Sequence, residues 1–97
     1  MRSLEHLAGA PGADLVEAGL HDLEAGRETV AALLVSMATT RLRSVGINVP
    51  PVAGGRPSHR LYDLLALEDA RTAHSRFNAL VGRLASFARA AEHAGTR

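Results

Sequence analysis

The chain has 97 residues, no cysteine and a formal net charge of +1. This length predicts a single domain over residues 1–97, since domains commonly have about 100 to 150 residues. The absence of cysteine excludes disulfide bonds, thiolate catalysis and cysteine-ligated zinc. Nine of the eleven arginines follow residue 28, so a local basic patch is compatible with the sequence although the overall charge does not indicate a polyanion-binding protein.

No segment predicts a membrane anchor. The longest strongly apolar run, Val30 to Ala38, contains Ser36 and is far shorter than the roughly 20 residues that a membrane-spanning helix needs. Glu5 and His6 interrupt the N-terminus before an apolar signal region can form. We therefore expect a cytoplasmic protein. All basic residues are arginine and none is lysine, which indicates the high-GC coding bias of actinobacteria.

Residues 1–12 contain Pro11 between two glycines, and we expect them to form a flexible segment. A helix is predicted from Asp14 to the glycine at position 26, because apolar residues recur at helical spacing and Gly26 is a suitable C-terminal stop. Asp14 and Glu17 have the spacing of a capping box at its start.

The next predicted helix runs from Val30 to Ser44, with Thr29 as its N-cap and Gly46 as its stop. The short turn before it predicts antiparallel packing against the preceding helix. Residues 46–57 contain three prolines and three glycines, and this composition indicates a linker between two pairs of helices.

A short helix is predicted from Ser58 to Leu67, followed by a long helix from Ala70 to Ala94 with Asp69 as its candidate N-cap. Whether the two are separate or continuous through position 69 is left open by the pattern. The long helix carries an apolar heptad seam formed by Ala70, Ala73, Phe77, Leu80, Leu84, Phe87, Ala91 and Ala94. The predicted fold is therefore all-α, a small antiparallel bundle of four helices with a long C-terminal helix.

The sequence contains no arrangement of residues that indicates an enzyme. Glu17, His21 and Glu24 share one helix face and form half of a conceivable metal site, but no second set of ligands is placed by the sequence to complete it. A solvated helix face is the favoured interpretation. We predict no catalytic residue, no metal and no cofactor.

A partner-binding surface is predicted on one flank of the long helix. It combines apolar residues of the seam with polar neighbours, a composition typical of protein interfaces. Its residues are His74, Arg76, Phe77, Asn78, Leu80, Arg83, Leu84 and Phe87. Gly82 is a poor helix former on the same helix. An exposed helix face is the favoured interpretation of this position, and the close approach of another backbone is the alternative. Arg41 and Arg43 are candidate contacts to a polyanion.

Two blocks, GLHDLEAGRETVAALLVSMATTRLRSVGINVP (Gly19 to Pro50) and HRLYDLLALEDARTAHSRFNALVGRLASFARAAE (His59 to Glu92), are similar to small helical proteins of actinobacteria. They most resemble MenA-type antitoxins, which accompany nucleotidyltransferase toxins. This resemblance implies a protein without activity of its own that binds and restrains a toxin acting on tRNA acceptor ends.

The residues and the resemblance together predict a non-catalytic protein-binding module, most concretely an antitoxin with a cognate toxin as its partner. The alternative is a nucleic-acid-binding regulator that uses Arg41, Arg43, Arg76 and Arg83. This alternative is less favoured, because no helix-turn-helix spacing or aromatic stacking platform accompanies these arginines. Homodimerisation through the apolar seam is a further open outcome.

Overall fold

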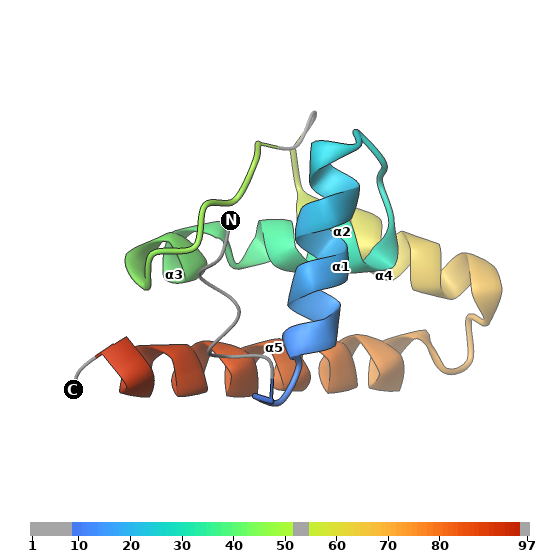
Figure 1. Cartoon of the computed structure of the whole chain (residues 1–97). Helices are drawn as coiled ribbons and strands as arrows, with labels where there is room; N and C mark the ends of the chain where they lie inside the picture. Colours follow the sequence, from blue (N-terminus) through green and yellow to red (C-terminus); the bar gives the residue numbers. More distant parts are fainter. Residues whose placement is uncertain (1–8, 52–54, 96–97) are drawn as a thin grey trace.

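A computed structural model describes residues 9–51 and 55–95 of the chain, with side chains to residue 94, and every regular element in these ranges is a helix. The first three are α1 (Ala13–Glu24), α2 (Val30–Met37) and α3 (Thr39–Ser44). They are followed by α4 (Pro57–Glu68) and α5 (Ala73–Gly95) (Figure 1). The prediction of an all-α fold with a long C-terminal helix is confirmed. Within the described ranges, none of the helices is long and apolar enough to cross a bilayer.

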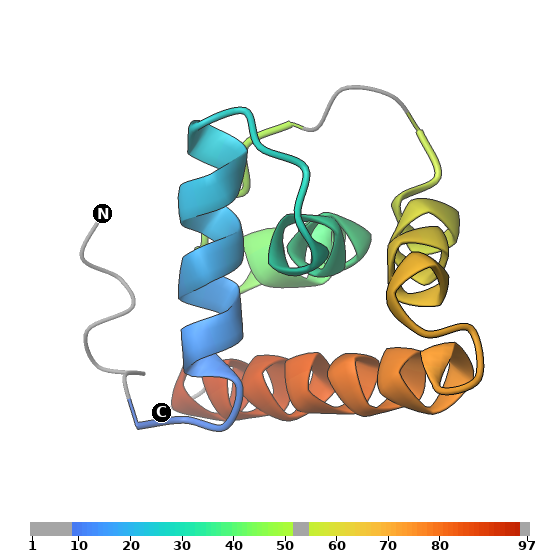
Figure 2. The same cartoon turned by 90° about the vertical axis from the view of Figure 1, so that its right-hand side faces the viewer.

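The helices do not all lie antiparallel, as the predicted bundle would require. α2 and α4 lie side by side and run in opposite directions, whereas α1 stands upright across both α2 and α5 in two perpendicular views (Figures 1 and 2). The prediction that α1 packs antiparallel to the next helix is therefore wrong. Gly19 explains the crossing, because a Cβ atom there would lie only 2.4 Å from the Ala31 carbonyl oxygen and 2.5 Å from Val35 Cγ2.

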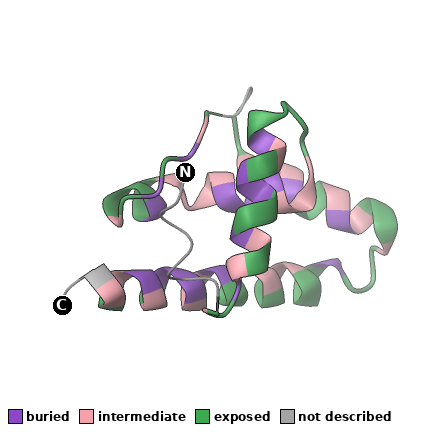
Figure 3. Ribbon diagram, in the orientation of Figure 1, coloured by how far each residue is buried: buried purple, intermediate pink, exposed green. Residues whose placement is uncertain are grey.

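One hydrophobic core joins all five helices (Figure 3). The predicted linker contributes to it, because Ile47 and Val49 are 2% and 0% exposed. The Arg43 guanidinium also donates a hydrogen bond of 2.8 Å to the Val49 carbonyl oxygen. The linker expected over residues 46–57 is thus anchored along its first part, while residues 52–54 lie outside the described ranges.

Two glycines end helices as predicted. Gly26 and Gly46 have φ angles of 76° and 89°, a left-handed conformation that other residues adopt only at a cost. The amides of Gly26 and Arg27 donate to carbonyls of the last turn of α1, which is the Schellman arrangement. Gly46 and Ile47 repeat it at the end of α3.

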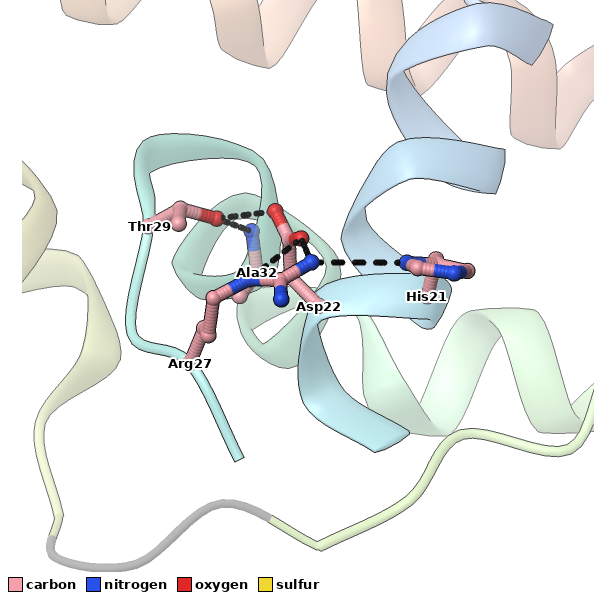
Figure 4. A network of polar contacts seen from close by, with 5 residues as sticks. All are labelled: His21, Asp22, Arg27, Thr29 and Ala32. Atoms are coloured by element: carbon pink, nitrogen blue, oxygen red, sulfur yellow. Dashed lines mark hydrogen bonds and ion pairs between the residues drawn. The ribbon is translucent and has the colours of Figure 1, made fainter. Parts of the chain in front are cut away.

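The turn between α1 and α2 is held by a polar network (Figure 4). Thr29 caps α2 as predicted, its hydroxyl accepting a hydrogen bond of 3.1 Å from the Ala32 amide. The same hydroxyl donates to Asp22 Oδ2 at 2.6 Å, and Arg27 donates to Asp22 Oδ1 at 2.8 Å. Hydrogen bonds from Thr29 and then from Arg27 lower the pKa of the Asp22 carboxyl below its usual 3.8.

The start of α1 differs from the predicted capping box. The N-cap is Gly12, with a φ angle of 77° and no side-chain cap, and the Asp14 carboxylate pairs with Arg83 at 3.0 Å instead. Gly12 is buried, and a Cβ atom there would lie 2.6 Å from the Arg83 carbonyl oxygen. The predicted flexible segment therefore packs against α5 at its end, while residues 1–8 lie outside the described ranges.

The helix predicted from Val30 to Ser44 is interrupted at Ala38, which has φ −106° and ψ 21°. Next to the break, the Ser36 hydroxyl donates to the Ala32 carbonyl and the Thr39 hydroxyl donates to the Ser36 carbonyl. Serine and threonine side chains that bond to nearby carbonyls compete with the helical ladder and bend helices. This local competition accounts for the division into α2 and α3.

The boundary between α4 and α5 is a true break. α4 ends at Glu68, and the Asp69 carboxylate accepts a hydrogen bond of 3.0 Å from the Arg71 amide within the following turn. The Thr72 carbonyl accepts the first helical bond of α5, from the Arg76 amide at 2.9 Å. Asp69 is therefore a turn residue rather than the predicted N-cap, and Ala70 lies outside the helix.

Candidate functional site

The eight residues of the predicted partner-binding surface fall into three environments on α5. Leu84 and Phe87 are 6% and 0% exposed and belong to the core of the chain itself. Phe87 is enclosed by the chain, whereas Leu84 also lines a third hollow, described below. The other six lie at or near two separate hollows, one beside α4 and one between α5 and the start of α2.

The first hollow, which we call the aromatic pocket, lies between α4 and α5 and has a volume of about 350 Å³. It is lined by Ser58, His59, Tyr62, Asp63 and Phe77. The Tyr62 ring is the centre of a small aromatic group, with the Phe77 ring at 5.7 Å and the His74 ring at 6.5 Å between centroids. Tyr62 is not among the residues of the predicted partner-binding surface.

His74 and Asn78 lie on the outer side of this aromatic group. The Asn78 side-chain nitrogen is 3.2 Å from His74 Nε2, one helical turn away. Both residues are exposed. The polar residues predicted beside Phe77 therefore contact each other, and they lie next to Tyr62 of α4.

The second hollow, which we call the arginine groove, is lined by Val30, Glu68, Arg76, Ala79, Leu80 and Arg83. Both of its cations are paired within the chain, Arg76 with Glu68 at 2.8 Å and Arg83 with Asp14 at 3.0 Å. Gly82 is exposed and a Cβ atom there would meet nothing within 4 Å, in agreement with the favoured interpretation of an open helix face. The close backbone approach to α5 is made by Gly12, against the Arg83 carbonyl.

A third hollow was not predicted. It lies between α5 and the α2–α3 region, has a volume of about 460 Å³, and is mostly apolar. We call it the alanine groove, and its lining residues are Met37, Ala38, Thr40, Arg41, Ser44, Val81, Leu84, Ala85 and Ala88. Val81, Ala85 and Ala88 follow one another at spacings of four and three residues on α5, a helical pattern beside the seam that a search for small residues would have found.

The candidate polyanion contacts Arg41 and Arg43 both bond within the chain. Arg41 makes a two-pronged ion pair with Glu92 of α5, with Nε–Oε2 at 2.7 Å and Nη2–Oε1 at 3.0 Å. The hydrogen bond from Arg41 lowers the pKa of Glu92 below its usual 4.5. Arg43 bonds to the Val49 carbonyl. The ion pair joins α3 to α5.

Glu17, His21 and Glu24 are all exposed on α1. Across residues 9–51 and 55–95, no group of three or more histidine, aspartate or glutamate side chains is arranged to hold a metal ion. His21 instead lies near the polar turn, with Nδ1 3.5 Å from an Arg27 guanidinium nitrogen (Figure 4).

Comparison of the chain with protein-family models, with curated proteins and with solved structures gave no match.

Proposed function

We propose that this chain is a non-catalytic protein-binding module, an antitoxin that binds and neutralises a nucleotidyltransferase-type toxin. The class of partner comes from the resemblance of Gly19 to Pro50 and His59 to Glu92 to MenA-type antitoxins. The observation that carries a binding role is the alanine groove, an apolar hollow on the surface of a small chain.

The composition of the alanine groove supports a protein partner. Its floor is apolar and includes the buried side chains of Leu84 and Ala88, while Thr40, Arg41 and Ser44 supply polar groups around it. An apolar centre within a polar rim is the usual composition of a protein interface. Small side chains on α5 also let a partner helix approach the backbone closely.

The pairing of the arginines favours a protein partner over a nucleic acid. The four arginines on which a nucleic-acid role depends donate to a carboxylate or to a backbone carbonyl in the same chain. A phosphate backbone would have to displace these acceptors to gain its contacts. A toxin helix that enters the alanine groove needs no such exchange.

The test is co-expression of the chain with the tagged product of the adjacent gene, followed by copurification and a growth assay. Ala85→Glu places a long charged side chain in the alanine groove, at a position that is only partly buried. Ala18→Glu is the matched control, because it makes the same change at an exposed position of α1. We expect Ala85→Glu to abolish copurification and protection from the toxin, and Ala18→Glu to retain both.

Circular dichroism of both variants establishes that they fold. The proposal is wrong if the neighbouring product neither binds the native chain nor is toxic alone. It is also wrong if light scattering shows a homodimer that Ala85→Glu dissociates, because the alanine groove then serves self-association.

A further inference from the structure

The aromatic pocket between α4 and α5 has a different chemistry from the alanine groove. Its lining combines two aromatic rings with a carboxylate, a hydroxyl and an imidazole, from Tyr62, Phe77, Asp63, Ser58 and His59. The residues of α4 come from one stretch of the helix, and Phe77 closes the pocket from α5. None of these residues belongs to the surface on which the proposed function depends.

Asp63 is the distinctive group in this pocket. The carboxylates of Glu68 and Glu92 on the same two helices have arginine partners at 2.8 Å and 2.7 Å. Asp63 is exposed, and its side chain makes no ion pair or hydrogen bond with any other part of the described chain. The aromatic pocket therefore presents a carboxylate that is not paired within the described residues.

The two rings add a second attraction for a cation. A positive group is favoured over an aromatic face when it lies within about 6 Å of the ring centroid. The Tyr62 and Phe77 centroids are 5.7 Å apart and their planes are inclined by 52°, so one cation can lie within this distance of both centroids. Tyr62 is 37% exposed, which leaves part of the ring accessible from solvent.

We propose that the aromatic pocket binds the guanidinium group of an arginine side chain presented by the protein partner. The proposal rests on the proposed function for the source of the arginine, whereas the preference for a guanidinium follows from the pocket. A guanidinium is planar and stacks on aromatic rings, and its paired N–H groups match the two oxygens of a carboxylate. A phosphate or another anion would be repelled by Asp63.

Binding in the aromatic pocket can be followed by the fluorescence of Tyr62. Tyr62 is its one tyrosine and there is no tryptophan, so the intrinsic fluorescence of the whole protein arises from this site. The first experiment titrates the native chain with N-acetyl-arginine amide and follows this emission. N-acetyl-citrulline amide is the comparison, because it has nearly the same shape without the charge.

We expect a saturable change with the arginine compound at millimolar concentrations and a much smaller one with the citrulline compound. Asp63→Asn should weaken binding about three- to tenfold, and Phe77→Leu should also weaken it because one ring is lost. Glu17→Gln is the control, since it removes an exposed carboxylate from α1. No response to the arginine compound, or an equal response to citrulline, would overturn the proposal.

The second experiment measures the affinity of the chain for the toxin by calorimetry. Asp63→Asn should weaken the complex by a similar factor while Glu17→Gln leaves it unchanged. An unchanged affinity in Asp63→Asn would refute the assignment of a partner arginine to the pocket. If no toxin binds at all, the proposed function fails, and the fluorescence titration still decides whether the aromatic pocket takes a guanidinium.

Discussion

The two halves of α5 carry the same heptad pattern but differ in how far the rest of the chain covers them. In the C-terminal half, Leu84, Phe87 and Ala91 are buried, and the Arg41–Glu92 ion pair ties the helix to α3. In the N-terminal half, Phe77 and Leu80 are only partly buried and line the aromatic pocket and the arginine groove. Periodicity thus indicates which face of a helix turns inward, while the neighbouring helices determine the depth of burial.

The largest expected effect separates the two phenylalanines. Phe87→Ala removes a fully buried ring, and we expect it to lower the free energy of unfolding by about 3–5 kcal/mol. Phe77→Ala removes a partly exposed ring and should cost well under half as much. Urea unfolding followed by circular dichroism measures both. Equal losses would contradict the difference between the halves.

A glycine-to-alanine series tests the crossing of α1 and α2 against the open face of α5. Gly19→Ala introduces a methyl group that would overlap the Ala31 carbonyl, and overpacking of this kind costs about 1–3 kcal/mol. Gly82→Ala is the matched control in open space and should stabilise the isolated chain by about 0.5–1 kcal/mol. Thermal unfolding of both variants measures these effects. A destabilising Gly82→Ala would show that α5 is more closely covered at that point than the structure indicates.

The smallest expected effect is on the loss of stability at acidic pH. Folding lowers the pKa of Glu92 from its usual 4.5 and that of Asp22 from its usual 3.8. The unfolded chain therefore binds more protons in this range, so the stabilisation is complete above these values and is lost as the pH falls through the folded pKa values. Glu92→Gln should flatten the decline of the thermal midpoint between about pH 5 and pH 3. An unchanged decline in this variant would show that the Arg41–Glu92 pair does not tie α5 to α3 in solution.

The helix ends were predictable where a single residue type determines the backbone. Gly26 and Gly46 stop their helices and Thr29 caps α2 through local hydrogen bonds alone. The break at Ala38 could not be read from the apolar stripe, which continues through it, because it depends on competing hydroxyl groups at Ser36 and Thr39.

Long-range contacts limited the prediction of the candidate site. The close packing of α2 against Gly19 cannot be predicted from the helix that contains this glycine. Ile47 and Val49 lie in a segment with the composition of a linker, and their burial depends on the core formed by the helices. The sequence predicted that one flank of α5 combines polar and apolar residues. It did not predict that this flank lines three separate hollows, because the hollows depend on the positions of α2, α3 and α4. The alanine groove in particular needs α3 as a separate helix, whereas the prediction had one continuous helix from Val30 to Ser44.

Hydrogen–deuterium exchange of the chain, alone and in the presence of the proposed toxin partner, tests the central proposal most directly. If the toxin occupies the alanine groove, amides of α3 and of α5 between Val81 and Ala88 become more protected in the complex, while those in the middle of α1 are unchanged. Protection of α1 with no change around Ala85 would contradict the proposed surface.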